Sequence, residues 1–115
     1  MRSYFSRIAA ALNTLTKRLS EEFGPRGVRI NTVSPGPVGT RLWREPEGFG
    51  SLVGGSLGAS YEDFIAAMPT AFGLTTGSLV EPHEVAALIT FLASPVTAGL
   101  IDSEITIVSG ASKHI

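Results

Sequence analysis

The stretch Val28-Arg29-Ile30-Asn31-Thr32-Val33, followed by Ser34-Pro35-Gly36-Pro37, decides how the rest of this 115-residue chain is interpreted. Its first six residues are rich in β-branched side chains, which is typical of a short strand. Pro35-Gly36 ends the run sharply, because the third position of a type II turn requires a positive φ that glycine adopts freely. We therefore expect a strand over residues 28–33 and a tight turn directly after it.

The segment before this strand is predicted to be a helix that ends at Gly24-Pro25. Proline cannot continue a helix, and glycine suits the position just past its end. The apolar residues of the segment recur at steps of three and four, which places them on one stripe of a helix. They are Ile8, Leu12, Leu15, Leu19 and Phe23.

A long loop, two helices and a strand are expected after the turn. Residues 38–60 are rich in glycine and indicate a loop, which at this length is usually a lid or disordered. Ser60 and Asp63 form the start signal of a short helix over about residues 61–68. Pro82 begins another helix, which ends before Ser94-Pro95, and a last strand covers residues 104–108.

This order of elements predicts an α/β fold: part of a doubly wound, Rossmann-like parallel sheet with two strands and about three helices. We treat residues 1–115 as one partial domain. Two strands are too few for a covered and stable parallel sheet, so the pattern itself indicates missing surfaces.

Composition excludes several classes of function. With 43% hydrophobic and 17% charged residues and a net charge of −1, the chain has no basic cluster for nucleic acid. Its apolar runs are shorter than the roughly 20 residues of a membrane helix. It has no cysteine, which excludes disulfides and zinc–thiolate sites and makes the cytoplasm the expected location. No His/Asp/Glu group has metal-ligand spacing, so no metal is expected.

The run from Ala11 to Lys17 and the run from Gly24 to Thr40 resemble the short-chain dehydrogenase/reductase family, as do Pro82 to Ala86 and Phe91 to Ser94. The resemblance covers nearly the whole chain. It implies a nucleotide-binding sheet and hydride transfer between NAD or NADP and a carbonyl or alcohol substrate. The intact family chain is roughly twice as long as this one.

The resemblance also shows what this chain lacks. The family uses an upstream Ser and a Tyr-x-x-x-Lys motif, in which the Lys lowers the Tyr pKa and binds the cofactor ribose. Phe5 and Ala9 occupy the Tyr and Lys positions, and using Tyr4 instead places Ile8 at the Lys position. The glycines between residues 48 and 58 follow no predicted strand, so they are not the family's phosphate loop. We therefore expect no catalysis by this chain alone.

The nicotinamide end of the family site is retained. Pro35, Gly36, Val38 and Thr40 match positions that contact the cofactor in the family, and they are predicted to be a weak cofactor-binding remnant. The segment of about residues 39–77 corresponds to the substrate lid. Its apolar residues either line a substrate pocket or simply pack the lid, and they are Leu42, Trp43, Phe49, Leu52 and Phe64.

Two hypotheses of different kinds follow. The chain is a truncated or miscalled oxidoreductase, or it is a non-catalytic interaction module that pairs with itself or with an intact paralogue. The second is implied by the family, in which the long helix before the turn and the last helix and strand form subunit interfaces. The substrate cannot be inferred from these residues.

Overall fold

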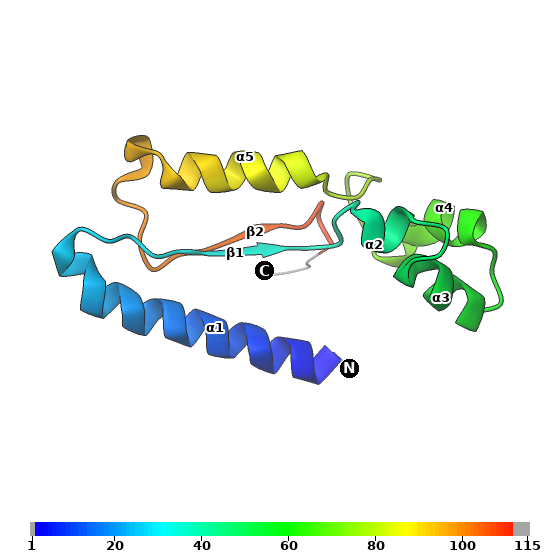
Figure 1. Ribbon diagram of the computed structural model, residues 1–115, viewed down its shortest axis with the longest axis horizontal. Coiled ribbons are helices and arrows are strands. Elements are labelled where there is room, and N and C mark those ends of the chain that lie inside the picture. The colour runs from blue at the N-terminus through cyan, green and yellow to red at the C-terminus, as the bar shows by residue number, and fades with distance from the viewer. Residues whose placement is uncertain (1, 112–115) are drawn as a thin grey trace. The chain divides into compact units, whose positions relative to one another are not determined.

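The computed structural model describes residues 2–111, with side chains from Arg7 onward. Within these residues, five α-helices and two strands follow one another (Figure 1): α1 Arg2–Phe23, β1 Thr32–Pro35, α2 Arg41–Arg44, α3 Phe49–Ser56, α4 Tyr61–Ala71, α5 Pro82–Ala93 and β2 Glu104–Ile107. Short 3₁₀ turns lie at Gly24–Arg26 and Pro95–Thr97. The chain divides into two compact units, one of residues up to 34 with 88–106, the other of residues 35–87 with those from 107 onward.

β1 and β2 form the two-stranded parallel sheet that the sequence predicts. The amide of Thr32 donates to the Ser103 carbonyl at 2.9 Å, and the amide of Gly36 donates to the Ile107 carbonyl at 2.9 Å. The first strand was predicted over residues 28–33 and instead covers Thr32–Pro35. The physical reason is its partner: regular pairing in β2 begins only at Glu104, so residues 28–31 have no strand opposite them.

The two faces of this sheet differ in polarity. Successive side chains of a strand point to opposite faces. In β1, Thr32 and Ser34 therefore share one face, and Val33 lies on the other, beside Ile89 and Leu92 of α5. In β2, Glu104 and Thr106 are exposed, and the two isoleucines that alternate with them are half-buried.

α1 contacts the polar face of the strands. The Thr16 and Thr32 hydroxyls lie 2.7 Å apart, and the Ser20 hydroxyl donates to the Ile30 carbonyl at 3.1 Å. Figure 1 shows this helix running alongside β1. The apolar stripe of α1 lies elsewhere on its surface: Ile8, Leu12 and Leu15 are 58%, 53% and 51% exposed. A stripe of this kind normally faces a core, but within the described residues its first three members are exposed and only Leu19 and Phe23 are half-buried.

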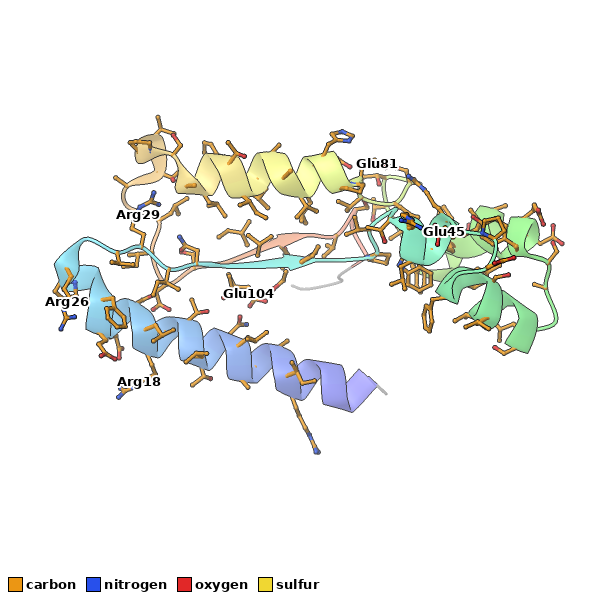
Figure 2. The ribbon with its side chains drawn as sticks, in the orientation of Figure 1. Arg18, Arg26, Arg29, Glu45, Glu81 and Glu104 are labelled. Atoms are coloured by element: carbon orange, nitrogen blue, oxygen red, sulfur yellow. The ribbon has the colours of Figure 1, made fainter. Side chains whose placement is uncertain are left out.

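Arg29 holds the connection between α5 and β2. Its guanidinium donates to the carbonyls of Thr97 at 2.8 Å, Ser94 at 3.1 Å and Leu100 at 3.3 Å. Asn31 adds a second tie, since its amide donates to Leu100 at 2.8 Å and its side-chain oxygen accepts from the Ser103 amide at 3.1 Å. The Ser94 and Thr97 carbonyls also accept backbone amides, so Arg29 adds a charged donor to carbonyls just after the end of α5. Figure 2 shows Arg29 directed toward this connection.

Most helix boundaries agree with the sequence, but the lid does not. α1 ends at Phe23, and α5 begins at Pro82 and ends at Ala93, as expected. Ser60 accepts from the Asp63 amide at 3.2 Å and starts α4, which runs three residues beyond the predicted end. Residues 41–44 and 49–56, predicted as loop, are the helices α2 and α3. The reason is tertiary packing, because Gly54 of α3 lies so close to Phe64 of α4 that a side chain there would contact it at 2.9 Å.

The second unit has its own small core. Met68, Leu74 and Leu79 are buried at its centre. Trp43, Phe64 and Ile65 pack around them, together with Ala111 near the end of the described chain. The lid is therefore a packed element rather than a loop.

Replacing Arg29 by Met should destabilise the first unit. The change leaves three carbonyls without their charged donor, a loss of about 1–3 kcal/mol. The measurement is the unfolding midpoint in urea, followed by circular dichroism. The control is Arg18→Met, since Arg18 is 77% exposed and only 3.4 Å from Glu21. Equal midpoints for the two variants would contradict the role given to Arg29.

Candidate functional site

The residues that the sequence assigns to the cofactor lie in the turn after β1. Within the second unit, Val38 forms a parallel bridge with Val80. The Gly39 amide donates to the Val80 carbonyl at 2.8 Å, and the Val80 amide donates to Pro37 at 3.3 Å. The turn is thus fixed by backbone hydrogen bonds.

Gly36 is required at its position by close packing. A Cβ on this residue would lie 3.0 Å from the Val108 Cα, which is tighter than nearly all real contacts of that kind. Its amide already donates to Ile107. The type II turn predicted at Pro35-Gly36 is wrong, because Gly36 does not have the positive φ that the third position of such a turn requires. Glycine is needed here instead because the backbone passes directly beside the segment that follows β2.

Thr40 lies just before α2 with its side chain exposed. Its carbonyl accepts from the amides of Trp43 at 3.1 Å and Arg44 at 3.0 Å. Its hydroxyl does not cap the helix. The hydroxyl is therefore available to a ligand, which is what the family role of this position requires.

An ion pair lies beside this turn. Two nitrogens of the Arg44 guanidinium bond the two oxygens of the Glu81 carboxylate, Nη1 to Oε2 at 2.8 Å. The hydrogen bond from Arg44 is the main cause that lowers the pKa of Glu81 below 4.5, and the attraction of His83 adds to it. The same hydrogen bond raises the pKa of Arg44. The Tyr61 hydroxyl also donates to the Arg44 carbonyl.

The apolar lid residues divide into two groups. Trp43 packs against three phenylalanines, with ring centres 5.3 Å from Phe49, 6.4 Å from Phe64 and 5.8 Å from Phe72. Leu42 and Leu52 are 55% and 70% exposed. Trp43 and Phe64 therefore mainly pack the lid, and the two leucines contribute nothing to its core.

The two family positions for proton transfer lie in α1. Ala9 is exposed and carries no charge. Phe5 belongs to the helix, and its side chain lies outside the described part. An alanine cannot lower a phenol pKa or bind a ribose hydroxyl, so the absence of a catalytic pair at these positions stays a prediction from the residue types.

A polar groove of about 280 Å³ lies between α1 and the start of β2. Its groups bond one another: the Asn13 amide donates to Glu104 at 2.7 Å, and Lys17 lies 3.3 Å from Asp102. Because these donors and acceptors are already paired, the groove is a solvated seam of the fold.

The described residues contain neither a membrane-spanning helix nor a cluster of metal ligands. No helix between residues 2 and 111 is long and apolar enough to cross a membrane. In the same residues no three His, Cys, Asp or Glu side chains come together as metal ligands would.

The fit to a nicotinamide dinucleotide is partial. The turn offers fixed backbone groups and the Thr40 hydroxyl, which fit the nicotinamide end. In the described residues no strand leads through a glycine loop into a helix, which is the arrangement that binds a pyrophosphate. The residues present therefore fit one end of the cofactor and not the whole of it.

Sequence reasoning missed the Arg44–Glu81 pair. The two residues are 37 positions apart, and no local spacing pairs them. Taken alone, Glu81 before Pro82 is simply a charge suited to a helix N-terminus. Gly39, five positions before Arg44, leaves room for a guanidinium beside the backbone but does not identify which arginine lies there.

Comparison with known proteins gives a consistent result. The profile of a family described as enoyl-(acyl carrier protein) reductase matches residues 4–112. L-2,3-butanediol dehydrogenase from Corynebacterium glutamicum is 27% identical over 97% of this chain and 41% of its own.

Two solved structures are also similar. A short chain dehydrogenase family protein from Francisella tularensis has a TM-score of 0.79 at 27% identity, over 91% of this chain and 41% of its own. An NADPH-bound short chain oxidoreductase with an atypical catalytic center, from Pseudomonas aeruginosa, has a TM-score of 0.72 at 30% identity, over 92% and 37%. The chain thus spans about 40% of the length of the relatives that it matches.

Acid should release the Arg44–Glu81 pair. Because the folded-state pKa of Glu81 is lowered, its contribution is present above about pH 4.5 and is lost as the pH falls through that lowered pKa. Trp43, the single tryptophan, precedes Arg44 and should report the change by fluorescence. Glu81→Gln should remove this acid transition, whereas Glu45→Gln, which breaks the neighbouring Arg41 pair, should retain it. A transition that survives in Glu81→Gln would contradict the assignment.

Proposed function

Because this chain belongs to the short-chain dehydrogenase/reductase family, we propose that it is the C-terminal half of a nicotinamide-dependent oxidoreductase. In this proposal it supplies the nicotinamide-facing turn and the lid, and it does not transfer hydride by itself. The cofactor is NAD or NADP, and the substrate is a carbonyl or alcohol compound. The support for the cofactor class is family membership together with the NADPH in the Pseudomonas relative.

One observation carries the proposal. The turn from Pro35 to Thr40 is held by backbone hydrogen bonds with the Thr40 hydroxyl exposed, whereas position 9 is an alanine. A bound nicotinamide would supply the hydride chemistry. Val38 and Thr40 would orient its carboxamide end, and the lid above them would exclude water. Proton transfer requires a group that this chain does not place there.

We propose a cytoplasmic location, since the chain contains no cysteine and so needs no oxidising compartment. This proposal is supported by amino-acid composition alone.

A second candidate function, a non-catalytic interaction module, is favoured by the exposed stripe of α1. Four residues of the stripe form two pairs that are symmetric about a point between residues 13 and 14. The inner pair is Leu12 and Leu15, and the outer pair is Ile8 and Leu19. Two antiparallel copies of α1 paired about that point would cover all four residues with one another. Arg7 of one copy would then lie about 3 Å along the axis from the position opposite Glu22 of the other. The partner is a second copy or an intact paralogue that presents the same helix.

No tight binding of NAD(H) or NADP(H) to the purified chain is expected by isothermal titration. The contacts for the pyrophosphate and ribose are missing, so only weak association at the turn remains. In NMR titrations at millimolar cofactor, shifts should be confined to residues 38–40 and should be lost in Thr40→Val. Micromolar affinity would overturn the proposal that the chain is only half of a site.

Self-association through α1 is tested by light scattering after size exclusion, with and without an intact relative. Leu12→Glu should convert dimers to monomers, because it places a carboxylate in the middle of the apolar stripe. Ala10→Glu is the matched control, since Ala10 is exposed on the opposite side of the same helix. A chain that is monomeric at high concentration and binds no intact relative excludes the interaction module.

A further inference from the structure

We propose that Arg44 is a positioning residue that holds residues 38–40 in place, with its guanidinium set between Gly39 and Glu81. The inference rests on the proposed function only for its purpose, since residues 38–40 are the part of the turn that faces the nicotinamide. The interactions among Arg44, Gly39 and Glu81 are all within this chain. All of the groups involved belong to the second unit.

The position of the guanidinium is fixed from several sides. Its two terminal nitrogens form a double hydrogen bond with Glu81. A planar fork that bonds both oxygens of a carboxylate has little freedom to rotate. The Arg44 carbonyl accepts from the Tyr61 hydroxyl at the start of α4. The arginine therefore joins α2, α4 and the residue before α5.

Glu81 is a firm anchor for this arginine. It directly precedes Pro82, the first residue of α5. Its amide donates to the Glu84 carboxylate at 2.6 Å, and its carbonyl accepts from the Glu84 amide at 3.0 Å. The bond from the Glu81 amide to the Glu84 side chain is one half of a capping box, and it holds residue 81 at the helix start. Figure 2 places Glu81 at that end of α5.

Gly39 transmits the position of Arg44 to the turn. A Cβ at residue 39 would lie 2.5 Å from the Cζ atom and from one terminal nitrogen of the guanidinium. The guanidinium thus covers the peptide of the residue whose amide donates to Val80. Moving the guanidinium away uncovers this hydrogen bond, and adding a methyl group at residue 39 pushes the guanidinium away.

The neighbouring arginine on α2 provides a natural contrast. Arg41 also pairs with a glutamate, Glu45, at 2.5 Å, but its side chain is 88% exposed and the pair lies within one helical turn. Exposed pairs of this kind contribute little. Of the two arginines on this four-residue helix, Arg41 bonds a residue one turn away, whereas Arg44 bonds a residue at the start of α5.

The test is amide hydrogen exchange by NMR on the full chain, read at Gly39 and at Leu74, whose amide donates to Pro69 within the lid. Four variants are compared with the unmodified chain: Arg44→Met, Gly39→Ala, the double variant and Arg41→Met. We expect exchange at residue 39 to rise about tenfold in Arg44→Met and in Gly39→Ala, with Leu74 unchanged. The double variant should match the single ones, because both remove one interaction. Arg41→Met should behave like the unmodified chain.

Three results would overturn the proposal. Exchange at residue 39 is unaltered in Arg44→Met, or the two changes add fully in the double variant, or exchange at Leu74 rises as much as at residue 39. The last result would mean that Arg44 only stabilises the lid as a whole. Arg44→Lys keeps the charge without the planar guanidinium, so its exchange rate at residue 39 should lie between those of the unmodified chain and Arg44→Met. None of these readouts needs a cofactor, so failure here and failure of the cofactor titration are separate outcomes.

Discussion

The parallel ladder between β1 and β2 is the constraint on which the other features depend. Four residues of each strand pair, and this short register sets which side chains face α1 and which face α5. It also determines where the chain leaves β1, because the Gly36 amide bonded to Ile107 is the last rung before the turn. A shift of one residue would exchange the two faces of the sheet and move the turn away from Val108.

The polarity of the two faces explains the behaviour of α1. The helix bonds the Thr32 and Glu104 side chains and the Ile30 carbonyl, and the part of its apolar stripe from Ile8 to Leu15 stays exposed in the described residues. The exposed stripe is the feature on which the proposed interaction module rests. The chain spans about 40% of the length of the relatives that it matches.

The lid shows how tertiary contacts create secondary structure. Residues 49–56 contain three glycines and have poor helix propensity, yet they form α3, because Gly50 lets the Trp43 backbone approach closely and Gly54 does the same for Phe64. The aromatic cluster around Trp43 then makes the lid a compact element with its own core. A lid of this kind can move or be held as one body, which is why a single arginine can matter to the turn beside it.

The sequence by itself determined the features that local chemistry controls: the ends of α1 and α5, the start of α4 at Ser60 and the α/β class. It also places an alanine at position 9, so the prediction that the family's Lys position carries no charge does not depend on the fold. Only the tertiary structure decided the register of β1, the helices α2 and α3, the exposed stripe of α1 and the Arg44–Glu81 pair. The register and the ion pair depend on residues tens of positions apart, and α2 and α3 depend on contacts between neighbouring elements. Contacts of either kind produce no periodic pattern in the sequence.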